Sequence, residues 1–235
     1  MILHTASHLI QYGSSSYDFG SRIVTDSFGN DYVTAQTDSG IDGHTNARSN
    51  DIFIIKFTNA GIKQWTRQLG PSSNEYGYGI ATDPSGNVYV TGYTGGNLDG
   101  NNNAGGNDVF VAKYDVTGAK HWTKLLRTSS GDIDYDIAAD SNSNVYVTGP
   151  TLGGLGGTTN AGSVDIFVVK YSSSGVKQWT QQLGTSSWDQ AYGITSDSSG
   201  NIYVTGWTAG GLDCNTSAGS ADILVVKYDT NGNKK

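Results

Sequence analysis

The chain has 235 residues, of which 33 are glycine and 3 are proline, and its formal net charge is −7. Only 15% of the residues are charged, which argues against nucleic-acid binding and against an anionic membrane surface, because both need clustered Lys and Arg. Four histidines and one cysteine, Cys214, leave too few ligands for a disulfide framework or a Cys/His zinc site. No apolar segment approaches the roughly 18 residues of a membrane span, and residues 1–13 lack the pattern of a signal peptide.

A unit of 57 residues recurs along the chain without insertion or deletion. Three segments carry the repeat: a Tyr-Val-Thr motif after Asn, an apolar run that begins with Asp and reaches Lys, and a Trp-Thr motif. They lie at 30–35, 87–92, 144–149 and 201–206; at 51–57, 108–114, 165–171 and 222–228; and at 64–70, 121–127 and 178–184. Repeats of this length indicate a propeller or a solenoid.

Each unit predicts four strands, which we name a to d outward from a propeller axis. In the second unit they are 76–83, 88–94, 107–115 and 119–127, with turn residues between them. Strand c is apolar on successive residues, which is typical of a strand that is covered on both faces. We therefore predict one all-β domain over residues 1–235, a β-propeller of four four-stranded blades: 18–70, 76–127, 133–184, and 190–235 completed by 4–12.

The outer strand of the last blade is predicted at the other end of the chain. Residues 8–13 match residues 65–70 at the repeat spacing, so residues 4–12 are expected to complete the last blade. The four blades then either close as a four-bladed ring or form half of an eight-bladed ring with a second chain joined head to tail. A third possibility is that the chain is a fragment of a longer protein.

The run LDGNNNAGGNDVFVAKYD at 98–115, HW at 121–122 and DSNSNVYVTG at 140–149 resemble the SBBP β-propeller repeat. That family is found mostly in bacterial and archaeal surface or secreted proteins, so the resemblance implies an extracellular or cell-surface location. Its propellers are generally larger rings, and four blades in one chain depart from that pattern.

Two sets of polar residues recur in every blade and are interpreted as structural. An Asp at the start of strand c is expected to anchor the long loop before it, and an Asn before strand b is expected to hydrogen-bond the a–b turn. The sets include Asp51, Asp108, Asp165 and Asp222, and Asn87, Asn144 and Asn201.

The b–c loops, at 38–50, 95–107, 152–164 and 209–221, and the d–a loops are expected to share the binding face of the propeller. One hypothesis is recognition of a glycan or another polar polymer, in which aromatic rings stack on sugars while amides and carboxylates bind hydroxyl groups. The candidates are Tyr93, Trp188 and Trp207 for stacking, and Asp99, Asn101, Asn103, Asp213 and Asn215 for hydrogen bonding.

A second hypothesis is a calcium ion on Asp99, Asn101 and Asn103, whose oxygen-bearing side chains alternate as in hard-cation loops. The third blade has Gly156 in place of the Asp, which breaks the pattern. No other metal or cofactor is expected.

The histidines fall at unrelated repeat positions, so no general base with a fixed partner is visible. The leading functional prediction is a non-enzymatic propeller scaffold or binding module. One alternative is an architectural unit whose partner is another copy of itself, a homodimer in the simplest case. Another alternative, the weakest, is an enzyme with a site at the mouth of the channel.

Overall fold

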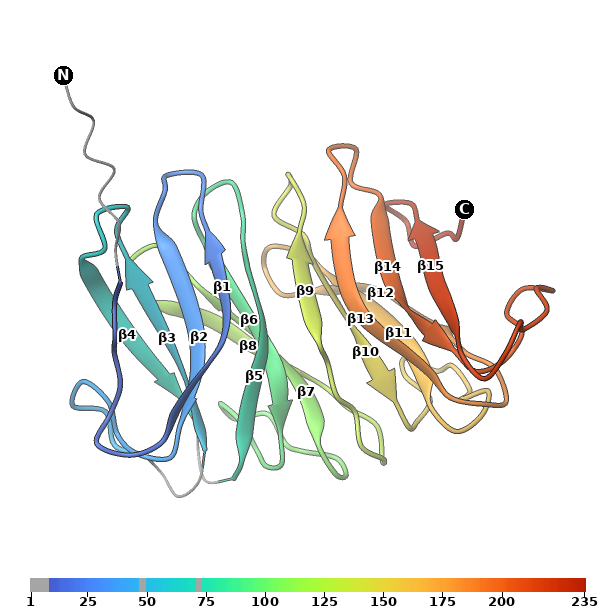
Figure 1. Ribbon diagram of the computed structural model, residues 1–235, viewed down its shortest axis with the longest axis horizontal. Helices are drawn as coiled ribbons and strands as arrows, with labels where there is room; N and C mark the ends of the chain where they lie inside the picture. The colour runs from blue at the N-terminus through green and yellow to red at the C-terminus, as the bar shows by residue number, and fades with distance from the viewer. Residues whose placement is uncertain (1–8, 47–49, 71–72) are drawn as a thin grey trace.

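A computed structural model describes residues 9–46, 50–70 and 73–235, and the regular structure in these ranges consists of strands (Figure 1). Within them there is no helix with the length and hydrophobicity needed to cross a membrane.

Fifteen strands form four antiparallel sheets in the described residues, three with four strands and the last with three. The first sheet contains β1 (Asp18–Thr25), β2 (Asp31–Thr37), β3 (Asp51–Phe57) and β4 (Lys63–Leu69); the second β5 (Glu75–Thr82), β6 (Val88–Thr94), β7 (Asp108–Tyr114) and β8 (Lys120–Leu126); the third β9 (Asp136–Ala139), β10 (Val145–Thr151), β11 (Asp165–Tyr171) and β12 (Lys177–Leu183); and the fourth β13 (Asp189–Ser196), β14 (Ile202–Thr208) and β15 (Asp222–Tyr228).

The a–b turns show why the strands begin and end where they do. In the second blade the Asp83 carboxylate accepts hydrogen bonds from the backbone N–H groups of Ser85 and Asn87, from the Asn87 side chain and from the Tyr89 hydroxyl. Gly86 supplies the left-handed residue of the turn, with φ of 77°. The strands of this blade lie within one or two residues of the predicted ranges because this turn repeats with the sequence.

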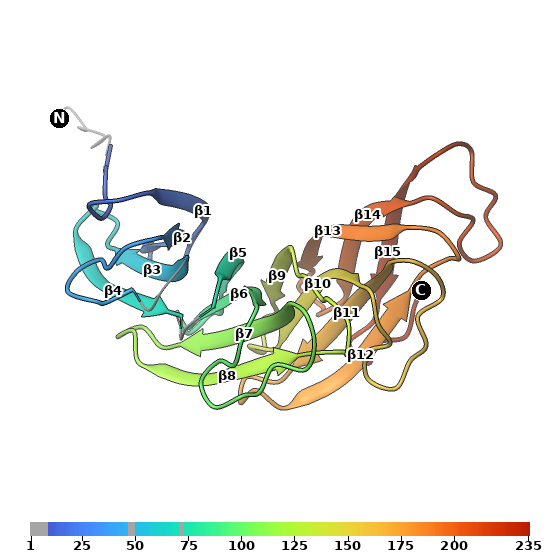
Figure 2. The same cartoon turned by 90° about the horizontal axis from the view of Figure 1, so that it is seen from below.

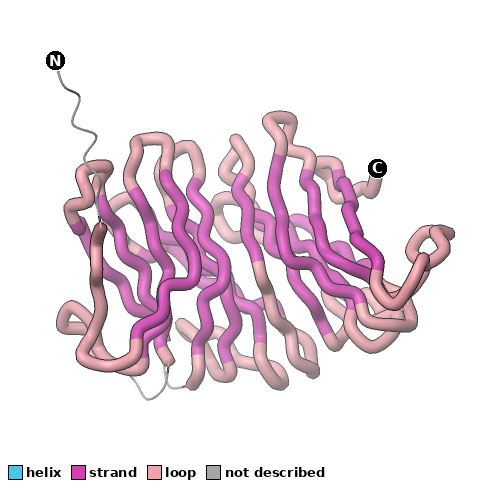
Figure 3. Tube along the Cα trace, in the orientation of Figure 1, coloured by secondary structure: helices cyan, strands magenta, loops and turns pink. Residues whose placement is uncertain are grey.

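The four sheets lie side by side in an open arc (Figure 2). The innermost strands, β1, β5, β9 and β13, line the concave side, and β4, β8 and β12 lie on the convex side. The b–c and d–a loops meet along one edge of the arc (Figure 3), where the N–H groups of Gly95, Leu152 and Ala209 donate to carbonyl groups of the d–a loops.

Each sheet packs on the next through strand c and its neighbours. Ile52 and Ile54 of the first blade share a core cluster with Phe110, Ala112 and Tyr114 of the second. Equivalent residues form the next two junctions. Between the second and third blades, Val109 and Val111 pack with Phe167, Val169 and Tyr171. Between the third and fourth blades, Ile166 and Val168 pack with Val226 and Tyr228.

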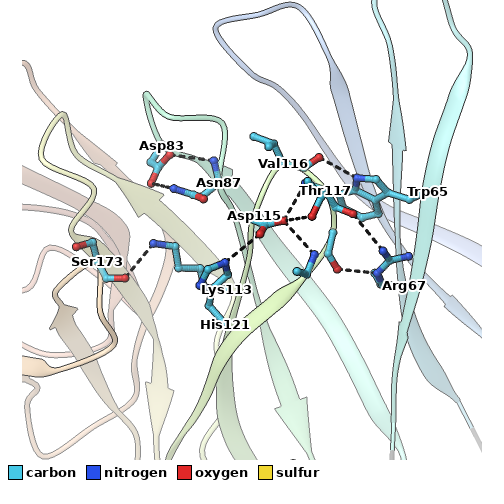
Figure 4. A network of polar contacts seen from close by, with 12 residues as sticks. Trp65, Arg67, Asp83, Asn87, Lys113, Asp115, Val116, Thr117, His121 and Ser173 are labelled. Carbon is cyan, nitrogen blue, oxygen red and sulfur yellow. Dashed lines mark hydrogen bonds and ion pairs between the residues drawn. The ribbon is translucent and has the colours of Figure 1, made fainter.

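Polar contacts between blades repeat as well (Figure 4). The Lys113 ammonium group reaches the next blade and donates to the Ser173 carbonyl at 3.0 Å. The Trp65 indole donates to the Val116 carbonyl at 3.1 Å, and Arg67 donates to the Gly118 carbonyl of the same turn. These contacts fix the angle between neighbouring sheets.

The expected completion of the last blade within the chain is not observed. Residues 9–12 are not in a strand, and Tyr12 packs edge-on against Phe57 of the first blade at 6.5 Å between ring centroids. The first and last blades lie at opposite ends of the arc, too far apart for residues 9–12 to reach β15 (Figure 2). The rest of the expected strand, residues 4–8, lies outside the described residues. A closed four-bladed ring is likewise not what a single chain forms in this structure.

Candidate aromatic binding surface on the concave side

A β-bulge interrupts the innermost strand of the first, second and fourth blades. The pairing of β5 with β6 shifts between Gly77 and Gly79, so Tyr78 has no partner on β6, and Tyr192 has the same position in β13. In the third blade the equivalent Tyr135 lies just before β9. A bulge turns the side chain of its extra residue out of the regular alternation, and this is how the tyrosines come together across blades.

The three tyrosines form one row with aromatic residues of the neighbouring strands. The ring centroids of Tyr78 and Tyr135 are 5.8 Å apart, and Tyr135 stacks on Tyr192 at 5.2 Å. Tyr93 of β6 extends the row at one end, 5.8 Å from Tyr78. Beyond it Tyr76 lies 4.9 Å from Tyr93, and at the other end the Trp207 indole N–H lies 3.4 Å from the Tyr192 hydroxyl. We call Tyr76, Tyr93, Tyr78, Tyr135, Tyr192 and Trp207 the aromatic row.

The row is partly exposed, so it can both hold its geometry and contact a ligand. Tyr192 is 48% exposed, and the other members are half-buried. Burial and the neighbouring carboxyl and tyrosine groups raise the pKa of Tyr78 and Tyr135, and burial with Tyr78 and Tyr76 raises that of Tyr93 far above its usual range. The hydroxyl groups therefore stay protonated at neutral pH and can donate hydrogen bonds.

A pocket of about 260 Å³ opens beside the row at the loop edge of the third and fourth blades. Tyr135, Pro150, Leu152, Trp188 and Gln190 are among the residues that line it. Its walls are mainly apolar with a few amide and hydroxyl groups, which suits a flat or elongated group of moderate polarity.

The structure brings together the three aromatic residues singled out from the sequence. Tyr93 and Trp207 belong to the row, and Trp188, which is 52% exposed, lines the adjoining pocket. Tyr78, Tyr135 and Tyr192 were not among the residues singled out from the sequence. Their recurrence at the 57-residue spacing was the available signal.

The polar candidates lie apart from the row, near the outer strands. The Asp99 carboxylate forms an ion pair with Lys120 at 2.6 Å and accepts a hydrogen bond from the Thr123 hydroxyl at 2.5 Å, both on β8. Asp213 forms an ion pair with Lys234. The side-chain amides of the Asn candidates donate to nearby backbone carbonyls: Asn101 to Leu98 and Asn215 to Leu212 in their own loops, and Asn103 to Thr94 at the end of β6.

The same geometry explains why the Asp pattern breaks in the third blade. Asp42, Asp99 and Asp213 have φ between 48° and 52°, and Gly156 has φ of 63° at the equivalent position. Asp and Gly both tolerate this left-handed conformation, so the turn is preserved when Asp is replaced by Gly. The described residues contain no group of three or more His, Cys, Asp or Glu side chains placed to hold a metal ion. The calcium hypothesis stays a prediction. The Asp99 carboxylate, which would have to bind the ion, already pairs with the Lys120 ammonium group.

Strand c of the second, third and fourth blades begins with a carboxylate that holds the preceding loop, buried in the second and third blades and partly exposed in the fourth. Asp108, Asp165 and Asp222 accept hydrogen bonds of 2.8 to 2.9 Å from the backbone N–H four residues earlier. A second carboxylate, at the start of strand a, binds the d–a loop: Asp132 accepts from Thr128, and Asp189 from Thr185. These carboxylates shape the loops.

The sheets are antiparallel, pack face to face in an arc and meet at a repeating junction. These are the features of the blades of a β-propeller. The family model described as "SBBP: Beta-propeller repeat" matches residues 64–99, 121–157 and 178–213. The chain therefore belongs to the SBBP-type β-propeller repeat proteins.

Two curated proteins are similar to the chain at low identity. One is an uncharacterized WD repeat-containing protein of Acanthamoeba polyphaga mimivirus, 25% identical over 185 residues, which cover 62% of this chain and 13% of that protein. The other is the regulatory protein FlaEY of Caulobacter vibrioides, 28% identical over 199 residues, or 76% of this chain and 21% of that protein. The chain thus spans a small part of the length of either relative.

Among solved structures, a Synechocystis apocarotenoid oxygenase aligns with a TM-score of 0.47 at 10% identity, covering 92% of this chain and 48% of the other. Virginiamycin B lyase from Staphylococcus aureus aligns with a TM-score of 0.42 at 12% identity, covering 96% and 71%. At these scores the alignments carry no inference about activity.

Proposed function

We propose that this chain is a non-enzymatic propeller scaffold that binds a partner on the concave side of the arc through the aromatic row. The observation that carries the proposal is the continuity of the row over three blades, from Tyr76 to Trp207. Aromatic side chains that are held by their neighbours give contact area with little loss of conformational entropy on binding. A scaffold role also agrees with the WD-repeat and regulatory relatives.

The finer proposal is that the partner is a glycan or a similar extended polar polymer. Sugar rings stack with their C–H faces on aromatic rings, and the phenol groups and the Gln190 amide can bind hydroxyl groups. Trp188 in the adjoining pocket adds a second stacking surface near Tyr135.

A glycan array, followed by titration with the best soluble polysaccharide, tests the finer proposal. We expect the double variant Tyr135→Ala/Tyr192→Ala to weaken binding at least about tenfold, a loss of about 1.4 kcal/mol. Tyr17→Ala is the matched control, because Tyr17 is 78% exposed and lies outside the row. No retention of any glycan would dispose of glycan recognition. A ligand, glycan or peptide, whose affinity is unchanged by the double variant would show that the row is not the binding surface.

A further inference from the structure

The last blade exposes a surface that is buried in every other blade. Inside the chain, the side chains of strand c that point toward the following blade are fully covered, and Ile52, Val109 and Ile166 are 0% exposed. Their counterpart Ile223 is 88% exposed, and the next residue on that face, Val225, is 68% exposed. The last blade therefore presents an unfilled half of the junction that holds the other blades together.

The first blade carries the opposite half, whose strand-c side chains are 2% to 7% exposed and line an open pocket. Phe53, Ile55 and Phe57 occupy the repeat positions of Phe110, Ala112 and Tyr114, which receive the preceding blade at the first junction. They line a pocket of about 340 Å³ on the open side of the first blade. Phe19 and Ile23 at the rim of this pocket are 60% and 66% exposed.

Residues 9–12 lie over this open face in the place of an outer strand from a preceding blade. In the repeat, Tyr12 corresponds to Leu69 of β4, and Phe57 corresponds to Tyr114. Leu69 packs in one cluster with Tyr114 of the following blade, and Tyr12 packs on Phe57 in the same way. At the far end of the arc, β15 has no fourth strand beside it among the described residues, although β3, β7 and β11 each have one.

We propose that two copies of this chain join head to tail, with the last blade of one copy docked against the first blade of the other. The pairing of β3 with β4 fixes the register by analogy: Ile52 faces Leu69 and Ile54 faces Arg67, so Ile223 of one copy faces Tyr12 of the second copy, and Val225 faces Ile10. Ile223 and Val225 then pack on Phe53 and Ile55 and close the exposed pocket.

Two polar contacts follow from the same repetition. At each junction within the chain, a Lys on strand c donates to a carbonyl of the next c–d turn, as Lys56 does to Val116 at 3.1 Å and Lys170 to Thr230 at 2.9 Å. The Lys227 ammonium group lies 5.3 Å from the centre of the Tyr203 ring, as Lys56 and Lys170 lie over the equivalent tyrosines. In the dimer it would donate to the Asn59 carbonyl of the second copy. The Asp18 N–H would donate to the Ala221 carbonyl, as Asp189 donates to Val164 at 2.9 Å.

A second copy fits this surface better than an unrelated partner does. The two halves match each other in chemistry because the three internal junctions use the same residue positions. The two halves also lie at opposite ends of an arc, so one chain cannot join its own ends without changing the angle between its blades (Figure 2). A head-to-tail contact whose rotation closes the ring satisfies both ends of both chains.

The mass of the purified 235-residue chain in solution, measured by light scattering over a range of concentrations, is the first test. We expect twice the 24.8 kDa of one chain. The double variant Ile223→Glu/Val225→Glu should be a monomer with an unchanged circular dichroism spectrum, because both side chains are exposed in the single chain. Val176→Glu, at a 58% exposed position away from both faces, should remain a dimer. A wild-type chain that is monomeric at every concentration overturns the proposal, and so does a dimer that the double variant leaves intact.

Cysteine cross-linking distinguishes joining of two chains from closure of one. In a Cys214→Ser background, Tyr12→Cys and Ile223→Cys are made in separate chains and mixed under oxidising conditions. A disulfide-linked dimer of the two variants is expected, because the predicted register places these positions opposite each other. Gln178→Cys, at an exposed outer-strand position, replaces Tyr12→Cys in the control and should give no cross-link. A third sample carries both cysteines in one chain. If the mixed pair does not cross-link and this third sample forms a disulfide at the mass of a monomer, the chain closes on itself and the proposal is overturned. Neither result depends on whether a glycan binds the aromatic row.

Discussion

Asp134 occupies a position where the other three blades have Gly20, Gly77 and Ala191. Its side chain is 0% exposed, and its carboxyl oxygens have at most a weak contact with the Thr91 hydroxyl among the described residues. The nearby Thr91 hydroxyl donates to the Phe110 carbonyl at 2.7 Å. Burial raises the pKa of Asp134 to about 8, against a smaller lowering by the Thr91 hydroxyl and the backbone, and the Asp136 carboxylate adds a little to the rise. The folded chain therefore holds this carboxyl in its neutral form at pH 7.

This burial predicts a stability that falls with rising pH. An unfolded Asp loses its proton near pH 4, whereas folded Asp134 keeps its proton up to about pH 8, so the unfolded state binds fewer protons between these values. The contribution of protonated Asp134 is present below about pH 4 and is lost as the pH rises toward 8.

Asp134→Ala should raise the free energy of unfolding at pH 7 by about 1–3 kcal/mol, the usual cost of an unsatisfied buried polar group. It should also flatten the pH dependence between 4 and 8. Urea denaturation across this range measures both effects, and Asp31→Ala, at a carboxylate that hydrogen-bonds Thr25, serves as the control. A variant that is less stable than wild type at pH 7 would contradict this account of Asp134.

Among the strands, the innermost and second strands of a blade approach each other most closely at one glycine. A Cβ atom added at Gly92 of β6 would overlap the carbonyl oxygen of Tyr76 on β5. The bulge at Tyr78 lies directly beside this contact, since Gly92 pairs with Gly77. The close approach and the bulge together set the position of the tyrosine.

Gly92→Ala should therefore destabilise the chain by about 1–3 kcal/mol, the usual cost of overpacking, and should displace Tyr78 from the row. Gly95→Ala is the control, because its Cβ atom would meet nothing closer than 3.7 Å. Thermal unfolding measures the first effect, and ligand titration measures the second. Equal melting temperatures for the two variants would count against a tight β5–β6 contact. The first blade has Ala35 at this position, paired with Gly20, and the same register shift between Gly20 and Arg22.

Strand positions could be predicted from the sequence because the turn residues repeat with the strands, as Asp83, Gly86 and Asn87 show. The bulge could not be predicted, because Gly77 and Gly79 allow both a regular strand and a bulged one. The polar candidates were placed in the right loops, but the Lys and Thr partners of Asp99 lie on β8, more than 20 residues along the chain. The sequence pattern alone does not show which side-chain oxygens already bind other residues of the chain.

For the whole molecule, the angle between neighbouring sheets depends on packing contacts between blades. The sequence repeat does not determine this angle, so it could not predict whether the ring closes. Among the described residues β15 has a neighbouring strand on one side only, whereas β7 is paired on both sides. Backbone amide groups on an unpaired edge exchange their hydrogens readily, because little structure must open.

Hydrogen exchange should therefore show protection of β15 that increases with protein concentration as copies join, while β7 stays equally protected throughout. In the variant Ile223→Glu/Val225→Glu, β15 should exchange about 100-fold faster than β7 at every concentration. Mass spectrometry of peptides from the two strands measures both. Protection of β15 that does not depend on concentration, in both wild type and variant, would contradict the open edge.

The junctions between blades have a consequence for the history of the gene. Because each junction joins the same two surfaces, recombination that removes or adds one 57-residue unit leaves every remaining junction chemically intact. The number of units in a gene can then change without a change in the blade itself. The curvature of the arc then limits how many units can meet in a ring.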